Sequence, residues 1–163
     1  MSKKYRRYTL AEYLDTLSMK TPVPGGGSAA ALTAALGVAL IAMAANYSRG
    51  KNESSAARRA IDNILKKSHQ MRKRLLALVD RDAEAYLGVV KTRRASDRLK
   101  KAALKKACEV PFEVCRLCYR AVNLTPFLIK NGNPNLLSDV EIANELLLAA
   151  FQSSQINVAI NAC

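Results

Sequence analysis

Apolar residues recur every three or four positions along most of this chain, which is the spacing of one face of an α-helix. The first such segment follows Thr9-Leu-Ala-Glu12, which has the form of a capping box. It predicts a short helix that ends near Met19 and has an apolar face formed by Leu10, Tyr13, Leu14 and Leu17. Because no useful stretch alternates apolar and polar residues, the pattern predicts an all-α protein.

Four longer helices are predicted after this one, at about residues 28–48, 54–93, 96–122 and 137–162. In the first of them Ala is by far the commonest residue, so neighbouring helices can pack closely around it, and we expect it at the centre of the fold. Ser28 is expected to be its N-cap. Pro111 should kink the helix that contains it. The prediction is a bundle of about five helices in a single domain over residues 1–163.

The charge of the chain is concentrated in its middle. The chain has 163 residues and a mass of 17.8 kDa, and its formal net charge is +13. Residues 49–106 contain eighteen Lys and Arg residues but six Asp and Glu residues. Such a segment attracts nucleic acid, acidic lipid or a polyanionic small molecule. Aromatic residues are not interleaved with the bases and no nucleic-acid motif is recognisable, which favours a solvated face or one that steers anionic substrates.

The cysteines and the long uncharged segment predict neither a metal site nor a membrane span. Four cysteines are too few for a disulfide scaffold and no signal peptide begins the chain, so we expect reduced thiols and a cytoplasmic protein. Cys115 and Cys118 have C-x-x-C spacing, but no second pair or suitably placed His completes a zinc site. The single histidine, His69, should be exposed. Ala is by far the commonest residue in 29–47, which favours a buried helix over a membrane helix.

The strongest local motif is Pro24-Gly-Gly-Gly-Ser28, which opens the Ala-rich helix. Free N–H groups and the helix dipole at such a start favour an anion or an electron-rich ligand group. The motif is not a P-loop, because the G-x-x-x-x-G-K-[ST] spacing is absent. The pattern equally allows a tight helix connection, although a plain connection rarely needs three successive glycines.

Two acidic segments could supply a catalytic carboxylate. Asp80 and Asp82 are two residues apart on a predicted helix, so at most one should point inward, and Asp82 has the more apolar neighbours. A carboxylate beside a closed pocket can have a raised pKa and act as a general base, although the pattern alone favours a solvated face. Ser138 and Asp139 could hold a polar ligand group, but a simple helix cap is favoured.

A series of segments occurs in the order found in a known family. The series begins with Thr21-Pro-Val-Pro-Gly-Gly-Gly-Ser28, which continues to Gly37, and then has Met43-Ala-Ala-Asn46, Gly50-Lys51, Leu78-Val-Asp-Arg-Asp82-Ala-Glu-Ala-Tyr86, Val110-Pro111, Gly132-Asn133, Ser138-Asp139 and Asn157-Val-Ala-Ile-Asn161. Together they resemble the cyclodeaminase/cyclohydrolase family. This family contains the cyclodeaminase half of formiminotransferase-cyclodeaminase and stand-alone methenyltetrahydrofolate cyclohydrolases. The resemblance covers roughly residues 9–161, and family members usually continue beyond the position of Cys163.

The resemblance implies a dimeric helical enzyme that acts on one-carbon units of tetrahydrofolate without a metal or redox cofactor. The first implied reaction hydrolyses 5,10-methenyltetrahydrofolate to 10-formyltetrahydrofolate. We expect this reaction, because no formiminotransferase domain accompanies the segments. The alternative within the family is a cyclodeaminase, which releases ammonia from 5-formiminotetrahydrofolate. Outside the enzymes, the alternative is a non-catalytic basic helical protein that binds nucleic acid or another polyanion.

The same resemblance suggests roles for individual residues. Asp82 or Asp139 would activate water or hold the amino-pyrimidine edge of the pterin, and Lys51 would meet a substrate carboxylate. The basic face would suit the polyglutamate tail of cellular folates. The remaining residues of the expected binding site are Pro24, Gly25, Gly26, Gly27, Ser28, Asn133 and Ser138.

Overall fold

A computed structural model of the protein describes residues 4–50 and 54–161. Within these ranges the regular structure consists of six α-helices and two short 3₁₀ helices. In chain order they are η1 (Tyr5–Arg7), α1 (Leu10–Ser18), α2 (Gly26–Tyr47), α3 (Ser55–Thr92), α4 (Asp97–Val122), α5 (Thr125–Asn131), η2 (Pro134–Leu136) and α6 (Leu137–Asn161). The all-α prediction and its five helices are confirmed. The short helix α5 was not predicted.

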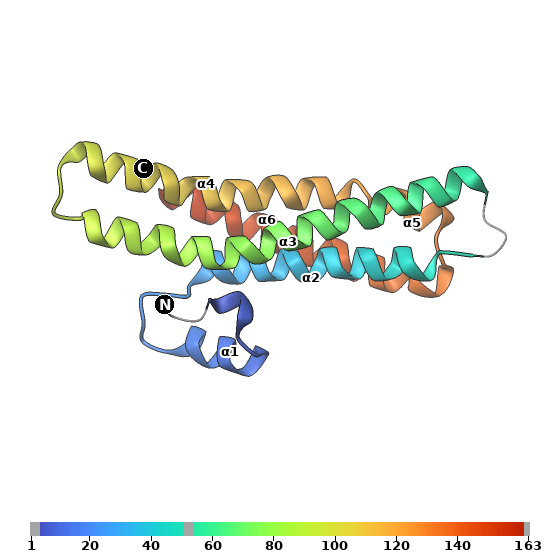
Figure 1. The fold of residues 1–163 in the computed structure, drawn as a ribbon, viewed down its shortest axis with the longest axis horizontal. Helices are drawn as coiled ribbons and strands as arrows, with labels where there is room; N and C mark the ends of the chain where they lie inside the picture. The colour runs from blue at the N-terminus through green and yellow to red at the C-terminus, as the bar shows by residue number, and fades with distance from the viewer. Residues whose placement is uncertain (1–3, 51–53, 162–163) are drawn as a thin grey trace.

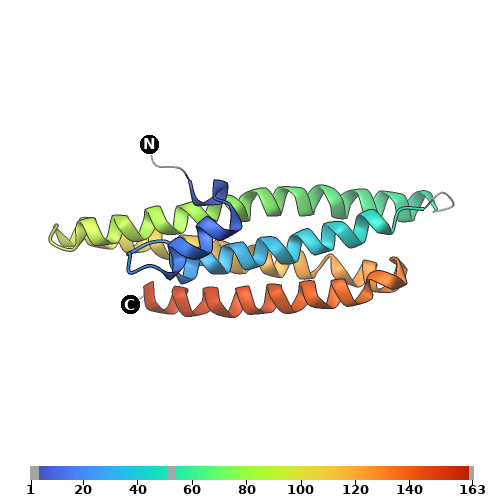
Figure 2. The ribbon, with the colours of Figure 1, turned by 90° about the horizontal axis from the view of Figure 1, so that it is seen from below.

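Four long helices, α2, α3, α4 and α6, form an up-and-down bundle (Figure 1 and Figure 2). The helix α2 packs against α3 and α6, and α4 packs against the same two helices from the opposite corner. The helices α2 and α4 run in one direction, while α3 and α6 run in the other. Because α2 and α6 are antiparallel neighbours, α2 begins at the end of the bundle where α6 finishes.

The Ala-rich helix α2 lies at the centre of this packing, as its composition predicts. Gly37 lies so close to α6 that a Cβ there would be 2.9 Å from Leu147 Cγ and 3.0 Å from the carbonyl oxygen of Ala143. By length and composition α2 could cross a membrane. However, 56% of its most apolar 18-residue stretch is buried inside the bundle, which is the burial expected of a core helix.

The α3–α4 hairpin extends beyond the ends of α2 and α6 (Figure 1). Two contacts show where along the hairpin the start of α2 and the end of α6 lie. Asp82 of α3 is beside Gly27 at the start of α2, and Asn161 Nδ2 at the end of α6 donates to the carbonyl of Ala107 at 3.3 Å. Residues 83–106 therefore form an overhang, which contains eight Lys and Arg residues but two acidic residues.

The segment η1–α1 stands beside the bundle (Figure 1), near the start of α2 (Figure 2). The predicted capping box is confirmed: Thr9 Oγ1 accepts from the backbone N–H of Glu12 at 3.2 Å, and Glu12 accepts from that of Thr9 at 2.6 Å. Within α1, Tyr13 alone is fully buried. The bundle covers half of the predicted apolar face: Tyr13 is buried and Leu17 packs against the core, whereas Leu10 and Leu14 are exposed.

Ser28 is not the N-cap of α2, so this prediction is wrong. The helix begins at Gly26 with Gly25 as its N-cap, which makes Ser28 the third helical residue. Its side chain is fully buried and its hydroxyl is hydrogen-bonded to Tyr13. The hydroxyl therefore satisfies a tertiary contact instead of a free N–H group of its own helix.

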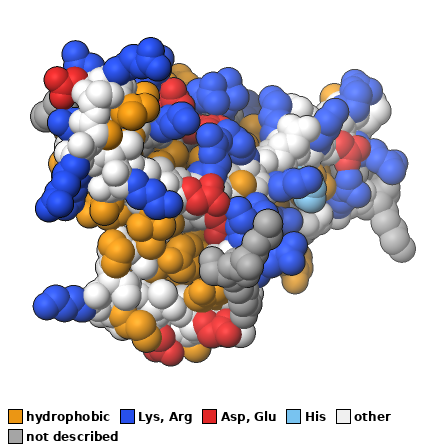
Figure 3. Space-filling model, turned by 60° about the vertical axis from the view of Figure 1, so that its left-hand side comes forward, with side chains coloured by type: hydrophobic (Ala, Val, Ile, Leu, Met, Phe, Trp, Pro, Cys, Tyr) orange, Lys and Arg blue, Asp and Glu red, His pale blue; other side chains and the backbone are white. Residues whose placement is uncertain are grey.

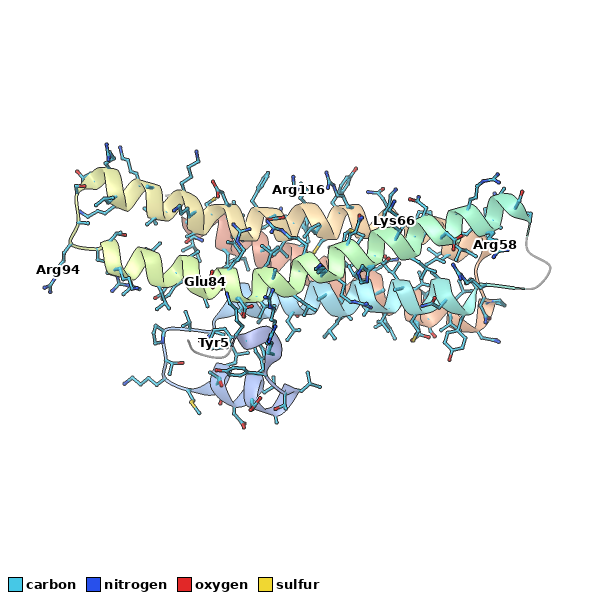
Figure 4. All side chains as sticks on the ribbon, in the orientation of Figure 1. Tyr5, Arg58, Lys66, Glu84, Arg94 and Arg116 are labelled. Atoms are coloured by element: carbon cyan, nitrogen blue, oxygen red, sulfur yellow. The ribbon has the colours of Figure 1, made fainter. Side chains whose placement is uncertain are left out.

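The basic residues of α3 and α4 lie mainly on the outer side of the hairpin, where Lys66 and Arg116 are labelled in Figure 4. Part of this charge is neutralised by Glu113, which accepts from Arg74 Nε and Nη2 at 2.6 and 2.7 Å. These bonds lower the pKa of the Glu113 carboxyl, and the charges of Arg116 and Arg81 act in the same direction. The expected solvated basic face is thus also an ion-pair network.

Candidate active site

The predicted glycine loop and Asp82 come together where α2 begins. A Cβ on Gly27 would lie 2.6 Å from Asp82 Cγ and 2.9 Å from Oδ2, so the carboxylate lies directly against the backbone of this glycine. The backbone N–H of Ser28 hydrogen-bonds the same carboxylate. The free N–H groups and dipole of a helix start stabilise negative charge, and α2 presents both to Asp82. Only glycine permits this approach at position 27.

Burial makes the carboxyl group of Asp82 a weaker acid than an ordinary aspartate. Its removal from water raises the pKa of Asp82, and the hydrogen bond from Ser28 opposes part of that rise. A raised pKa moves a carboxylate toward the range in which it exchanges protons effectively near neutral pH. The site can therefore supply a general base held in a fixed position.

Tyr13 reaches the same place from α1. Its Oη lies 2.9 Å from Ser28 Oγ in a buried hydrogen bond in which either hydroxyl can donate. Burial raises the pKa of Tyr13, the bond with Ser28 lowers it, and the charge of Asp82 raises it. The sequence assigns Tyr13 only to an apolar helix face, and no local pattern indicates a polar contact with a residue fifteen positions away.

Asp80, not Asp82, is the more buried of the two neighbouring acids, contrary to the expectation. It is only 4% exposed and lies under η1. The backbone N–H of Arg6 donates to Asp80 Oδ1 at 3.3 Å, and Arg6 Nε lies 3.2 Å from Oδ2. The N-terminal segment provides this cover and charge, which the pattern along α3 cannot reveal. Because Asp80 is paired with Arg6, Asp82 remains the acid available at the site.

The face of α3 that carries Asp82 continues along the overhang. Tyr86, Val89 and Arg93 follow Asp82 by four, seven and eleven residues, which places them on one side of a helix. Tyr86 is 43% exposed, and Arg93 is exposed near the tip of the hairpin. Figure 3 shows hydrophobic side chains gathered between the basic hairpin end and the lobe that contains α1. The rim of the site is therefore apolar near Asp82 and cationic farther out.

A second group of predicted residues lies at the other end of α2. The backbone N–H of Asn133 donates to Ser48 Oγ at 2.9 Å, and Asn133 Nδ2 donates to the carbonyl of Tyr47 at 3.4 Å. Ser138 and Asp139 follow in the first turn of α6. The length of α2 separates this group from Asp82 by about 30 Å. The structure therefore does not unite the two groups within one chain, and Lys51 lies outside the described residues.

Of the residues that the structure describes, Cys108, Cys115, Cys118 and His69 take no part in either group. Cys118 is buried in the core, and loss of solvent raises its pKa to about 12. Cys115 Sγ lies 3.6 Å from the carbonyl oxygen of Phe151, while His69 is exposed, as expected. Among residues 4–50 and 54–161, no three His, Cys, Asp or Glu side chains come together in a way that could hold a metal ion.

The fold and the site together define a class: a helical-bundle protein with a half-buried carboxylate of raised pKa at the glycine-rich start of its central helix. Residues 9–163 match the family described as formiminotransferase-cyclodeaminase, and the chain belongs to this family. The similar proteins of this family are named as enzymes. The resemblance noted in the sequence is thereby confirmed.

Relatives carry the names of both expected reactions. A methenyltetrahydrofolate cyclohydrolase from Methylorubrum extorquens is 33% identical over 94% of this chain and 79% of its own length. The formimidoyltransferase-cyclodeaminase of Gallus gallus is 30% identical over 93% of this chain, which is 30% of that longer protein. This chain is also similar to the crystal structure of formiminotetrahydrofolate cyclodeaminase from Thermotoga maritima. The two superpose with a TM-score of 0.92 at 33% sequence identity, over 96% of this chain and 79% of that chain.

Proposed function

We propose that this protein hydrolyses 5,10-methenyltetrahydrofolate to 10-formyltetrahydrofolate, with Asp82 as the general base. The observation that carries the proposal is the carboxylate of Asp82, held against Gly27 with its pKa raised by burial. Similarity to the Methylorubrum extorquens cyclohydrolase supports this reaction, and similarity to the Thermotoga maritima protein supports the cyclodeaminase reaction as second candidate. Both reactions occur at the carbon between N5 and N10, so the same base can serve either one.

The hydrolysis needs one group that first takes a proton and then returns it. A water oxygen attacks the cationic carbon between N5 and N10, and Asp82 takes one of the water protons. This step gives a neutral tetrahedral adduct with a hydroxyl group. The bond from this carbon to N5 then breaks as the hydroxyl becomes a carbonyl; Asp82 returns its proton to N5, and the hydroxyl proton passes to solvent. The formyl group remains on N10.

The overhang suits the length and chemistry of a folate. With the pterin beside Asp82, the p-aminobenzoyl ring would lie along Tyr86 and Val89, where aromatic and apolar contacts are available. Arg93 lies about 16 Å from Asp82 along the axis of α3, at a rise of 1.5 Å per residue. Figure 4 shows Arg94 at the tip of the same hairpin. These guanidinium groups would pair with the carboxylates of the glutamate tail and would mainly raise the rate of association.

The proposed function predicts protein-dependent loss of the methenyl absorbance when 5,10-methenyltetrahydrofolate is mixed with the purified protein. Growth of that absorbance from 5-formiminotetrahydrofolate, without its loss in the first assay, would instead identify a cyclodeaminase. Inactivity in both assays would contradict the enzymatic proposal. If DNA or RNA then bound tightly and with strong salt dependence, the basic protein would be the better description.

We further propose that the protein is a homodimer, in which α6 packs against a second copy. α6 contains neither Lys nor Arg, and its exposed residues include Leu148 and Ile156. Two grooves of about 540 and 390 Å³ lie along its boundary with α4, where Phe112, Tyr119 and Phe151 contribute aromatic side chains. An apolar surface of this kind supports association between copies.

An antiparallel pairing of two α6 helices would also complete the site. A two-fold axis near the middle of α6 brings the start of that helix in one copy to its end in the other. The end of α6 lies beside Ala107, at the base of the overhang that continues from Asp82. The partner subunit's Asp139 would thus approach the group around Asp82. The two groups of predicted residues, separated within one chain, would meet across the dimer.

The dimer proposal predicts a solution mass of twice 17.8 kDa for the wild-type chain. Leu148→Glu should give monomers, because Leu148 is 48% exposed in one chain but would be buried between two. Ile129→Glu is the matched control: it adds the same charge at a 50% exposed position on α5 and should leave the mass unchanged. Analytical ultracentrifugation measures all three proteins. A wild-type monomer at micromolar concentration would contradict the proposal.

A further inference from the structure

The helix α1 reaches the candidate active site through the hydroxyl group of Tyr13. Tyr13 is 4% exposed and Ser28 is fully buried, and their hydroxyl oxygens lie 2.9 Å apart. Elsewhere in α1, Leu17 packs partly against the core, while Leu10 is 76% exposed and Leu14 is 61% exposed. Figure 1 shows α1 apart from the four long helices. The Tyr13–Ser28 bond therefore links α1 directly to the first turn of α2.

The same serine faces the carboxylate of Asp82 through its backbone. Ser28 follows Gly27 directly, and the side chain of Asp82 occupies the space that a Cβ on Gly27 would need. The N–H of Ser28 hydrogen-bonds that carboxylate. Tyr13, Ser28 and Asp82 therefore form a continuous path from α1 through the first turn of α2 to α3, in which Tyr13 and Ser28 are buried and Asp82 is half-buried. Ser28 is fully buried in close packing, so its side chain cannot move independently. A change at its hydroxyl is therefore transmitted to its backbone.

We propose that Tyr13 is a positioning residue, whose bond to the Ser28 hydroxyl fixes the first turn of α2 and thereby holds the carboxylate of Asp82 against Gly27. The inference rests on the proposed function only in giving Asp82 the role of base. The Tyr13 hydroxyl is bonded to Ser28, and Ser28 in turn is bonded to Asp82 through its backbone. The effect of Tyr13 reaches the reaction through the position of Asp82.

The test removes the hydroxyl group and keeps the ring. In Tyr13→Phe the apolar packing of the ring remains, but the buried hydroxyl of Ser28 loses its partner, so the first turn of α2 becomes less fixed. Weakening the bond from the Ser28 N–H should raise the pKa of Asp82 further, because that bond stabilises the charged carboxylate. We expect kcat/KM at neutral pH to fall about tenfold. The rising limb of its pH profile should move to higher pH.

Two further variants make the result specific. Ser28→Ala removes the other end of the bond but keeps the backbone N–H, and should reproduce the effect of Tyr13→Phe. Tyr5→Phe is the matched control, because the Tyr5 hydroxyl makes no hydrogen bond to any residue that the structure describes. It should leave both turnover and titration unchanged. Circular dichroism of each variant measures whether the helices are retained.

A readout that does not depend on turnover separates this inference from the proposed function. Carbon-13 NMR of protein labelled at the aspartate carboxyl groups, with Asp82→Asn to assign the signal, follows the titration of Asp82 directly. A shift in Tyr13→Phe and Ser28→Ala, but not in Tyr5→Phe, is the expected result. An Asp82 titration that is the same in wild type and Tyr13→Phe would overturn the inference. A wild-type protein inactive on both folates would refute the proposed function alone.

Discussion

Replacing Asp82 with Asn will lower turnover of 5,10-methenyltetrahydrofolate by about a hundred- to ten-thousand-fold, the range typical of losing a general base. Asn has nearly the same shape and can still accept the hydrogen bond from the Ser28 N–H, so the first turn of α2 should keep its position. It cannot take a proton from water. The fall should therefore appear in kcat, while the helical circular dichroism spectrum stays that of the wild type.

The pH dependence provides a second readout of the same substitution. A base works only when deprotonated, so wild-type kcat/KM should rise with pH as Asp82 loses its proton. Because burial raises the pKa of Asp82, this rise should occur above the range of an ordinary aspartate. The residual activity of Asp82→Asn should lack this rise.

Matched substitutions show whether the loss is specific to Asp82. Asp97→Asn makes the same chemical change at an exposed residue paired with Lys100, and should leave turnover unchanged. Asp139→Asn tests the other predicted carboxylate. Wild-type activity in Asp82→Asn would refute its assignment as the base, and loss of activity in Asp139→Asn alone would assign that role to Asp139.

The helices could be predicted because their signals are local. The capping box at Thr9 and the apolar spacing along α3 each involve residues within a few turns of one another. The prediction that Ser28 caps α2 was wrong because the contact that decides its role is not local. A serine before an apolar run normally caps a helix, but its hydroxyl is used here by Tyr13, which belongs to another helix. The tertiary bond to Tyr13 thus outweighs the local preference of serine for the N-cap position.

The candidate site was predicted only in part, because its central contact joins two helices. Sequence reasoning identified Gly27 and Asp82 separately. Their contact depends on the axial position of α3 relative to α2, which is set by packing between the helices and not by local sequence pattern. The burial of Asp80 beneath Arg6 depends in the same way on where the N-terminal segment folds back.

The position of Asp139 could have been inferred from topology. In an up-and-down bundle, consecutive long helices alternate in direction, so the starts of α2 and α6 must lie at opposite ends. Gly25 caps the start of α2 and Asp139 lies in the first turn of α6. One chain therefore cannot bring both to one ligand, and a shared site requires a second copy. This argument connects the dimer proposal to the chemistry of the site.

Replacing Gly27 with Ala should abolish most of the activity without removing any polar group. The added methyl carbon would need the space that Asp82 occupies, since it would lie 2.6 Å from Cγ and 2.9 Å from Oδ2. The carboxylate must then turn away from the Ser28 N–H toward water. We expect turnover to fall by at least about a hundredfold, as for loss of the base itself. The pKa of Asp82 should fall back toward its ordinary value, because solvent would reach the displaced carboxylate.

Stability should change much less than activity in this variant. Alanine favours a helix over glycine by about 0.5–1 kcal/mol. Loss of a hydrogen bond to a charged group costs about 1.5–3 kcal/mol. The net effect should be a modest destabilisation of about 1 kcal/mol, measurable by urea unfolding.

Gly88→Ala is the control for the added methyl group. A Cβ at Gly88 meets nothing within 4 Å, so this variant should gain about 0.5–1 kcal/mol of stability and keep wild-type turnover. A folded Gly27→Ala protein with wild-type turnover would show that the reaction does not need Asp82 in this position. If instead activity falls while Gly88→Ala remains active, the loss is attributed to the contact between Gly27 and Asp82, because a methyl group added to a helical glycine in open space is tolerated.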